Sequence, residues 1–185
     1  MNKLILVTGG SRSGKSSFAE SLAGKIDDSV LYIATSIPFD DEMKARVEKH
    51  RKQRPKEWKT LEAYKDFDIR LKEAGACNKV FLLDCITLMV SNIILENSID
   101  WDSSSNEQIS EIEQTVVLEV EKLLKSVKDL NVSFIGVTNE VGMGIVPENR
   151  LSRVFRDIAG RINQLLAKAA DEVYLCVSGI PVRIK

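Results

Sequence analysis

The residues best suited to chemistry lie near the amino terminus, where positions 9–16 read Gly-Gly-Ser-Arg-Ser-Gly-Lys-Ser after an apolar run at 4–7. This is a complete G-x-x-x-x-G-K-S spacing between an expected strand and an expected helix. Gly9 and Gly14 permit backbone angles that point successive N–H groups into one phosphate-sized nest, at the positive end of the helix dipole. Lys15 would bring charge to the β and γ phosphates, and Ser16 would offer a hydroxyl to Mg²⁺. Rather than a chance glycine-rich turn, we predict a nucleoside triphosphate site made of Gly9, Gly10, Ser11, Arg12, Ser13, Gly14, Lys15 and Ser16.

Polar residues also follow the other apolar runs that we expect to form strands. Ligands of open α/β sheets bind beyond the carboxyl ends of the strands. Ala34, Thr35 and Ser36 follow the second run, and Asp84 ends the run at 80–83. Asp84 could cap a helix that begins near Ile86. With a P-loop in the same chain the metal role is favoured, so we predict that Ser16 and Asp84 hold Mg²⁺.

A dense basic segment at 40–56 surrounds His50, the single histidine of the chain. The pair Asp40–Asp41 begins an expected helix and Pro55 ends it. Two ordinary interpretations are a solvated basic helix with a half-buried histidine and a nucleic-acid patch, but the second lacks interleaved aromatic residues. In the third, the positive field lowers the pKa of His50 and keeps the imidazole neutral, so that it can attack phosphorus.

Apolar β-forming runs alternate with helical periodicity along the chain, which predicts an α/β fold with a parallel sheet in one domain over residues 1–185. Strands are expected at 3–8, 30–35, 79–84, 132–138 and 172–178. Gly179 and Pro181 suggest a hairpin that leads to a short final strand at 181–184. Helices are expected at 15–25, 40–53, 86–96, 106–129 and 150–170, with a polar loop at 97–106.

Composition excludes several classes of protein. The net charge of −1 gives no electrostatic support to general nucleic-acid binding. No apolar run approaches the ~18–20 residues of a membrane span. The chain enters a strand and the P-loop at once, so we expect no cleavable signal. Its three cysteines (Cys77, Cys85 and Cys176) lack metal-type spacing, and we expect reduced thiols and a cytoplasmic protein.

Taken together, these motifs resemble the bifunctional adenosylcobinamide kinase/adenosylcobinamide-phosphate guanylyltransferases of cobalamin synthesis. The resemblance covers essentially the whole chain and rests on residues 7–16, 31–36, 40–43, 50–51, 84–87 and, most specifically, 138–163. It implies a RecA-like P-loop fold, with a mostly parallel sheet flanked by helices, and a homotrimer. It also implies phosphorylation of adenosylcobinamide, followed by transfer of GMP from GTP through a guanylylated histidine. That histidine corresponds to His50.

The same resemblance implies the binding residues. ATP and GTP would be substrates, with Mg²⁺ as cofactor and small molecules as the only partners besides other copies of the chain. Lys15 and His50 would be catalytic. The nucleotide contacts carried over are the P-loop, Ala34, Thr35, Ser36, Arg51, Lys52, Gln53, Arg54, Glu62 and Asp84.

Alternatives from other classes remain at this point. A monofunctional P-loop small-molecule kinase would need no His50. A regulatory GTPase should carry a base-reading motif, but residues 138–141 read Thr-Asn-Glu-Val, and a D-x-x-G spacing at 157–160 falls inside a helical pattern. A RecA-like nucleic-acid motor is disfavoured by length and charge. The side chains of Arg150, Arg153 and Arg156 could bind phosphates, could contact a neighbouring subunit, or could form an ordinary solvated basic face of a helix.

Overall fold

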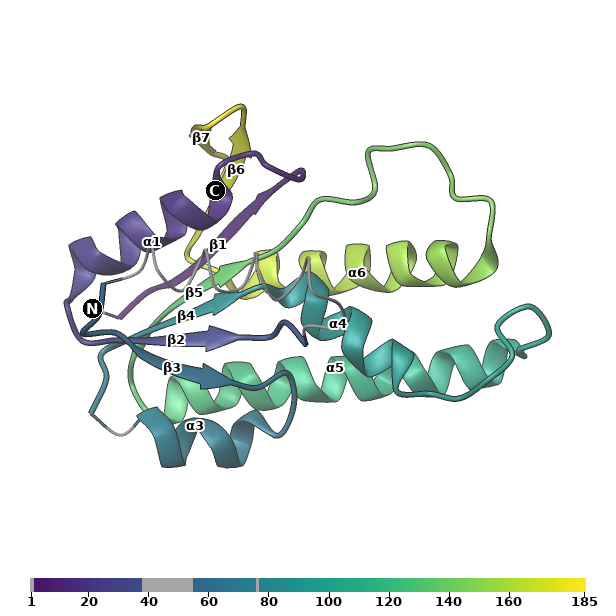
Figure 1. Cartoon of the computed structure of the whole chain (residues 1–185), viewed down its shortest axis with the longest axis horizontal. Coiled ribbons are helices and arrows are strands. Elements are labelled where there is room, and N and C mark those ends of the chain that lie inside the picture. The colour runs from purple at the N-terminus through teal and green to yellow at the C-terminus, as the bar shows by residue number, and fades with distance from the viewer. Residues whose placement is uncertain (1, 38–54, 76) are drawn as a thin grey trace.

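One mostly parallel sheet organises the part of the chain that the computed structural model describes, residues 2–37, 55–75 and 77–185. Within these residues, seven strands form a sheet in the order β3-β2-β4-β5-β1-β6-β7 (Figure 1). Strands β1 to β6 pair in parallel, and β7 pairs antiparallel with β6. The predicted α/β fold with a C-terminal hairpin is confirmed.

The observed elements match most of the predicted ones within a residue or two. The strands are β1 (Leu4–Gly9), β2 (Val30–Ala34), β3 (Lys59–Glu62), β4 (Val80–Asp84), β5 (Ser133–Val137), β6 (Glu172–Val177) and β7 (Ile180–Arg183). The helices are α1 (Lys15–Ile26), α3 (Phe67–Gly75), α4 (Ile86–Leu95), α5 (Asn106–Asp129) and α6 (Arg150–Ala169). The sequence did not predict β3 and α3, and the helix expected at 40–53 lies outside the described residues.

Two apolar layers cover the sheet because successive residues of a strand point to opposite faces. On β4, Phe81 and Leu83 join a core cluster with α3, α4, α5 and α6. Val80 and Leu82 join the other cluster, under α1. Strands that are buried on both faces explain the continuous apolar runs of the sequence.

The longest helix is fixed at its start by a capping box. Ser105 Oγ accepts a hydrogen bond from the Gln108 N–H (3.3 Å), and the Gln108 side chain accepts one from the Ser105 N–H (2.9 Å). These contacts satisfy backbone donors that have no partner within the helix. They place the start of α5 at residue 106, the last residue of the predicted polar loop.

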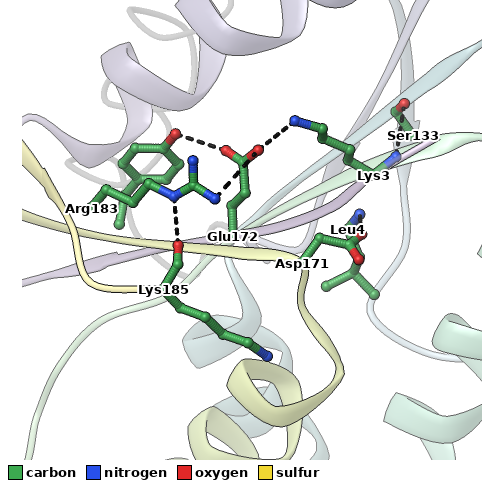
Figure 2. A network of polar contacts seen from close by, with 8 residues as sticks. Lys3, Leu4, Ser133, Asp171, Glu172, Arg183 and Lys185 are labelled. Carbon is green, nitrogen blue, oxygen red and sulfur yellow. Dashed lines mark hydrogen bonds and ion pairs between the residues drawn. The ribbon is translucent and has the colours of Figure 1, made fainter. Parts of the chain in front are cut away.

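A polar network closes the open end of the C-terminal hairpin, as Figure 2 shows. Glu172 Oε1 accepts from Lys3 Nζ (2.5 Å), and its Oε2 accepts from the Tyr174 hydroxyl (2.7 Å). Arg183 of β7 lies 3.9 Å from the same carboxylate and donates to the main-chain oxygen of Lys185. These contacts join β6 and β7 to Lys3, the residue before β1.

We expect this network to make stability depend on pH. The hydrogen bonds from Lys3 and Tyr174 hold the pKa of Glu172 below its usual value near 4.5. A lowered carboxylate pKa adds stability that is present above the unfolded-state pKa and is lost as pH falls through the folded-state pKa. Glu172→Gln should therefore lose about 1 kcal/mol of unfolding free energy at neutral pH. In urea unfolding, the gap between variant and wild type should narrow as pH falls below 4.5; a constant gap would contradict this assignment.

Candidate active site

The P-loop forms the turn between β1 and α1, as its spacing predicted. Gly14 has φ +88° and is the residue before the helix, which begins at Lys15. A side chain at this φ would be strained, so glycine is required there. The buried Lys15 side chain folds back over the loop, and its Nζ donates to the Gly10 carbonyl oxygen (2.9 Å). The Ser13 N–H donates to the same oxygen (3.3 Å), which gives the loop a compact shape.

Asp84 ends β4 and its side chain is held in place. The Tyr32 hydroxyl, on the neighbouring strand β2, donates to Asp84 Oδ2 (3.0 Å). Only β5 separates β4 from the P-loop strand β1, so the two strands lie about 10 Å apart. The carboxylate therefore lies at the same edge of the sheet as the P-loop.

The charges of Asp84 and Lys15 both act on the pKa of the buried Cys85 thiol. Burial raises the pKa of the Cys85 thiol to about 11, with a further upward contribution from the Asp84 charge and a smaller downward one from Lys15. Burial likewise raises the pKa of Cys176. Both thiols are therefore neutral at pH 7 and are poor nucleophiles.

The oxygen donors at this edge fit Mg²⁺. This ion prefers oxygen ligands and commonly takes one or two from the protein, with phosphates and water completing its shell. Ser16 presents a partly exposed hydroxyl in the first turn of α1, and Asp84 presents a carboxylate. Among the described residues, no group of three or more His, Cys, Asp and Glu side chains could hold a metal by itself. The donor set thus suits a metal that arrives with a nucleotide.

A buried polar network links the strand ends beside the P-loop. Thr87 Oγ1 lies 3.1 Å from Thr138 Oγ1, which donates to Asn163 Oδ1 (2.7 Å). Asn139 donates its N–H to Thr87 Oγ1 (2.6 Å) and accepts from Asn163 Nδ2 at its carbonyl (3.1 Å). The next N–H, that of Glu140, donates to Gly9 O (3.1 Å). The network therefore attaches the end of β5 to the first residue of the P-loop.

Comparison with known proteins identifies the family. Residues 5–184 match the model of the cobinamide kinase / cobinamide phosphate guanyltransferase family. The chain belongs to this family. It is 50% identical over 182 residues to the "Bifunctional adenosylcobalamin biosynthesis protein CobU" of Escherichia coli K12, with 98% of this chain and 99% of that protein covered.

Two further relatives of this kinase/guanyltransferase family agree. The protein of the same name from Salmonella typhimurium LT2 is 49% identical over 187 residues, with 98% of this chain and 99% of that protein covered. The "Bifunctional adenosylcobalamin biosynthesis protein CobP" of Pseudomonas aeruginosa is 36% identical over 180 residues, with 97% of this chain and 96% of that protein covered. The predicted family and the bifunctional kinase and guanyltransferase class are confirmed. None of the described helices is long and apolar enough to cross a membrane.

The three residues expected after β2 differ in their surroundings. Thr35 is buried, and its hydroxyl both donates to Cys85 O (2.8 Å) and accepts from Cys85 N (2.9 Å). Its carbonyl accepts from Asn92 Nδ2 (2.7 Å). Ser36 Oγ is buried without a hydrogen-bond partner among the described residues, and Ala34 is partly buried. Of the two hydroxyls, Ser36 is the better placed to accept a ligand, because Thr35 is engaged with the backbone next to Asp84.

Of the other site residues carried over by resemblance, the structure describes Glu62, which does not lie beside the P-loop. Glu62 ends the edge strand β3, and the order of the sheet puts it four strands from β1, roughly 19 Å across. It lies at the same carboxyl edge, on the far side of Asp84. His50, Arg51, Lys52, Gln53 and Arg54 lie outside the described residues.

Two of the three arginines at the start of α6 bind loops. Arg150 donates from Nη1 to Asp102 O (3.0 Å) and from Nη2 to Ser104 O (2.6 Å). Arg153 donates to Pro147 O (3.0 Å) and to Glu148 O. Arg156 pairs with its neighbour Asp157 (3.5 Å). For Arg150 and Arg153 these contacts favour none of the three interpretations given above. They favour a fourth, the local support of main-chain loops.

We expect Arg150→Ala to lower the unfolding free energy by about 1–3 kcal/mol, because two carbonyl oxygens lose a charged donor. GTP affinity should change little. Arg156→Ala is the matched control, and should cost less because its ion-pair partner, Asp157, is exposed to solvent. Urea unfolding and calorimetric GTP binding measure both effects. A normal stability with weakened GTP binding would instead assign Arg150 to phosphates.

Sequence reasoning missed several residues that shape this site. Tyr32 holds Asp84, while Thr87 and Asn163 fix the end of β5. Each is a polar side chain within an otherwise apolar strand or helix face, and buried polar groups need partners. That signal was present in the sequence, but it does not name the partner.

Proposed function

We propose that this protein phosphorylates adenosylcobinamide and then transfers GMP from GTP to adenosylcobinamide phosphate, giving adenosylcobinamide-GDP, through a GMP adduct of His50. Family membership over residues 5–184 supports the two activities. The observation that carries the kinase step is the P-loop, with Lys15 folded over it and Asp84 held two strands away. The proposed domain is one catalytic unit over residues 1–185.

In the kinase step, a hydroxyl oxygen of adenosylcobinamide attacks the γ phosphorus of ATP or GTP. A P–O bond forms, the bond to the β-phosphate oxygen breaks, and the hydroxyl proton is released. Residues 9–14 bind the triphosphate through main-chain N–H groups, and Lys15 stabilises negative charge on the transferred group. Ser16 and Asp84 would hold Mg²⁺, which, when bound, neutralises charge on the β and γ phosphates. Tyr32 orients the Asp84 carboxylate.

In the second step, a neutral His50 nitrogen attacks the α phosphorus of GTP and pyrophosphate leaves. A phosphate oxygen of adenosylcobinamide phosphate then attacks the same phosphorus, and the P–N bond breaks to return His50. The basic residues around His50 in the sequence support this role, because positive charge favours the neutral imidazole and attracts phosphates. Nucleotide contacts by Ala34, Thr35, Ser36, Arg51, Lys52, Gln53, Arg54 and Glu62 are part of the proposal.

The proposed assembly is a homotrimer, and the proposed compartment is the cytoplasm. Free cysteines at Cys77, Cys85 and Cys176 favour a reducing compartment. Size-exclusion chromatography with light scattering tests the trimer.

Two labelled forms of GTP test the function. With adenosylcobinamide present, γ-labelled nucleotide should give labelled adenosylcobinamide phosphate, and α-labelled GTP should label first the protein and then adenosylcobinamide-GDP. A monofunctional kinase would transfer only the γ label. Absence of α label from both protein and product would contradict the guanylyl step alone.

A further inference from the structure

The turn of the C-terminal hairpin lies against the P-loop. The residues of this two-residue turn, Ser178 and Gly179, have φ +52° and +84°, as in the turns that suit right-twisted hairpins. The Gly179 N–H donates to the carbonyl oxygen of Ser13 (2.9 Å). Ser13 belongs to the P-loop, so opposite ends of the chain meet at the phosphate site.

Two of the P-loop glycines, Gly9 and Gly14, lie close to the hairpin. A Cβ on Gly14 would lie 3.0 Å from Gly179 Cα, and a Cβ on Gly9 would lie 2.5 Å from Cys176 O. Neither position has room for a larger residue without moving the hairpin backbone. Glycine is thus needed at both positions for the approach of β6 and its turn, as well as for the loop's own conformation.

The contact with Gly179 orients a phosphate-binding donor. A peptide unit is planar and trans, so its C=O and N–H point in opposite directions. Fixing the Ser13 oxygen on the hairpin therefore fixes the Gly14 N–H on the side away from the hairpin. The Glu140 N–H acts in the same way on Gly9 O, and so on the Gly10 N–H. Each end of the loop is held by one donor from outside it.

The hairpin is itself firmly attached to its surroundings. The network around Glu172 fixes its open end (Figure 2). The Tyr174 ring packs edge-on against Phe18 of α1, with 5.1 Å between ring centroids. The turn therefore has a stable base from which to hold the P-loop.

We propose that the Ser178–Gly179 turn is a positioning element of the phosphate site, which holds the Ser13–Gly14 peptide in its phosphate-binding orientation before nucleotide binds. The inference rests on the proposed triphosphate binding at the P-loop. Gly179 touches no reacting atom and acts through Ser13. The turn therefore affects the binding of nucleotides that have β and γ phosphates, and affects the binding of a nucleoside monophosphate much less.

Substitutions at Gly179 test this role. A Cβ there would meet no atom within 4 Å, so alanine causes no clash, but φ +84° is strained for it. Both variants keep the backbone N–H, but asparagine tolerates this φ better than alanine. We expect Gly179→Ala to weaken GTP binding about five- to tenfold in calorimetry, with GMP binding within twofold, because one phosphate donor is misplaced. Gly179→Asn should restore most of the GTP affinity, and Gly144→Ala, also in open space, should match wild type.

Equal losses for GTP and GMP, or an alanine variant that binds GTP normally, would overturn the inference while leaving the proposed function intact. A wild-type protein that binds neither nucleotide would overturn both. Amide hydrogen exchange on the wild-type protein gives a second test, which does not depend on whether a variant folds. The Gly179 N–H should exchange slowly without nucleotide, and fast exchange would overturn the contact.

Discussion

Replacing Lys15 with alanine should lower kinase turnover by roughly 10²–10³-fold while the protein stays folded. The Lys15 ammonium lies over the loop, 2.9 Å from Gly10 O, where it would meet the β and γ phosphates. A charge that is already in place costs no reorganisation when the phosphoryl group is transferred, so its removal acts mainly on turnover. Alanine is a good helix former, so the first turn of α1 should persist.

Steady-state kinetics with adenosylcobinamide and ATP or GTP measure this effect, and circular dichroism checks the fold. Lys25→Ala is the matched control, since Lys25 is exposed in the last turn of the same helix. It should keep wild-type turnover. Near-normal turnover in Lys15→Ala would mean that the P-loop is not the nucleotide site of the kinase.

The sequence predicted the elements whose local pattern is strong. Runs such as 80–83 are apolar throughout because β4 is buried on both faces, and α5 repeats its buried residues at helical spacing. By contrast, β3 is short, mostly exposed and mostly polar, so it carries little strand pattern. Helix α3 did have a signal, since its buried Phe67 and Leu71 are four residues apart, but two positions make a weak pattern.

The residues of the candidate site also differ in how far the sequence could predict them. The P-loop and Asp84 were predictable because their chemistry depends on spacing within one strand–loop–helix or strand end. The order of the strands was not, and it is this order that separates Glu62 from the P-loop. The contact of Gly179 with Ser13 could not be predicted from the sequence either, because it depends on the pairing of β6 with β1. A local pattern names the residues that do chemistry better than those that hold them in position.

His50→Ala should abolish covalent labelling by α-labelled GTP and leave the kinase step much less affected. The two steps make different demands on the protein. Phosphoryl transfer uses a substrate hydroxyl as nucleophile and depends on Lys15, Ser16 and Asp84. The proposed guanylyl transfer uses a nucleophile from the protein. The buried thiols of Cys85 and Cys176 are poor candidates for it because burial raises the pKa of each. The imidazole of His50, the single histidine, is the attacking group that the family resemblance implies.

The chemistry of the label gives a second criterion. A phosphoramidate on histidine is labile in acid, so the wild-type label should be lost on acid treatment and should map to the peptide that contains His50. His50→Gln is the companion variant, since it keeps a polar side chain without a nucleophilic nitrogen, and it too should show no label. Some loss of kinase rate in either variant is compatible with the assignment if the imidazole also contacts nucleotide. Acid-labile label that persists in both variants would refute it, because the chain has no second histidine to take over.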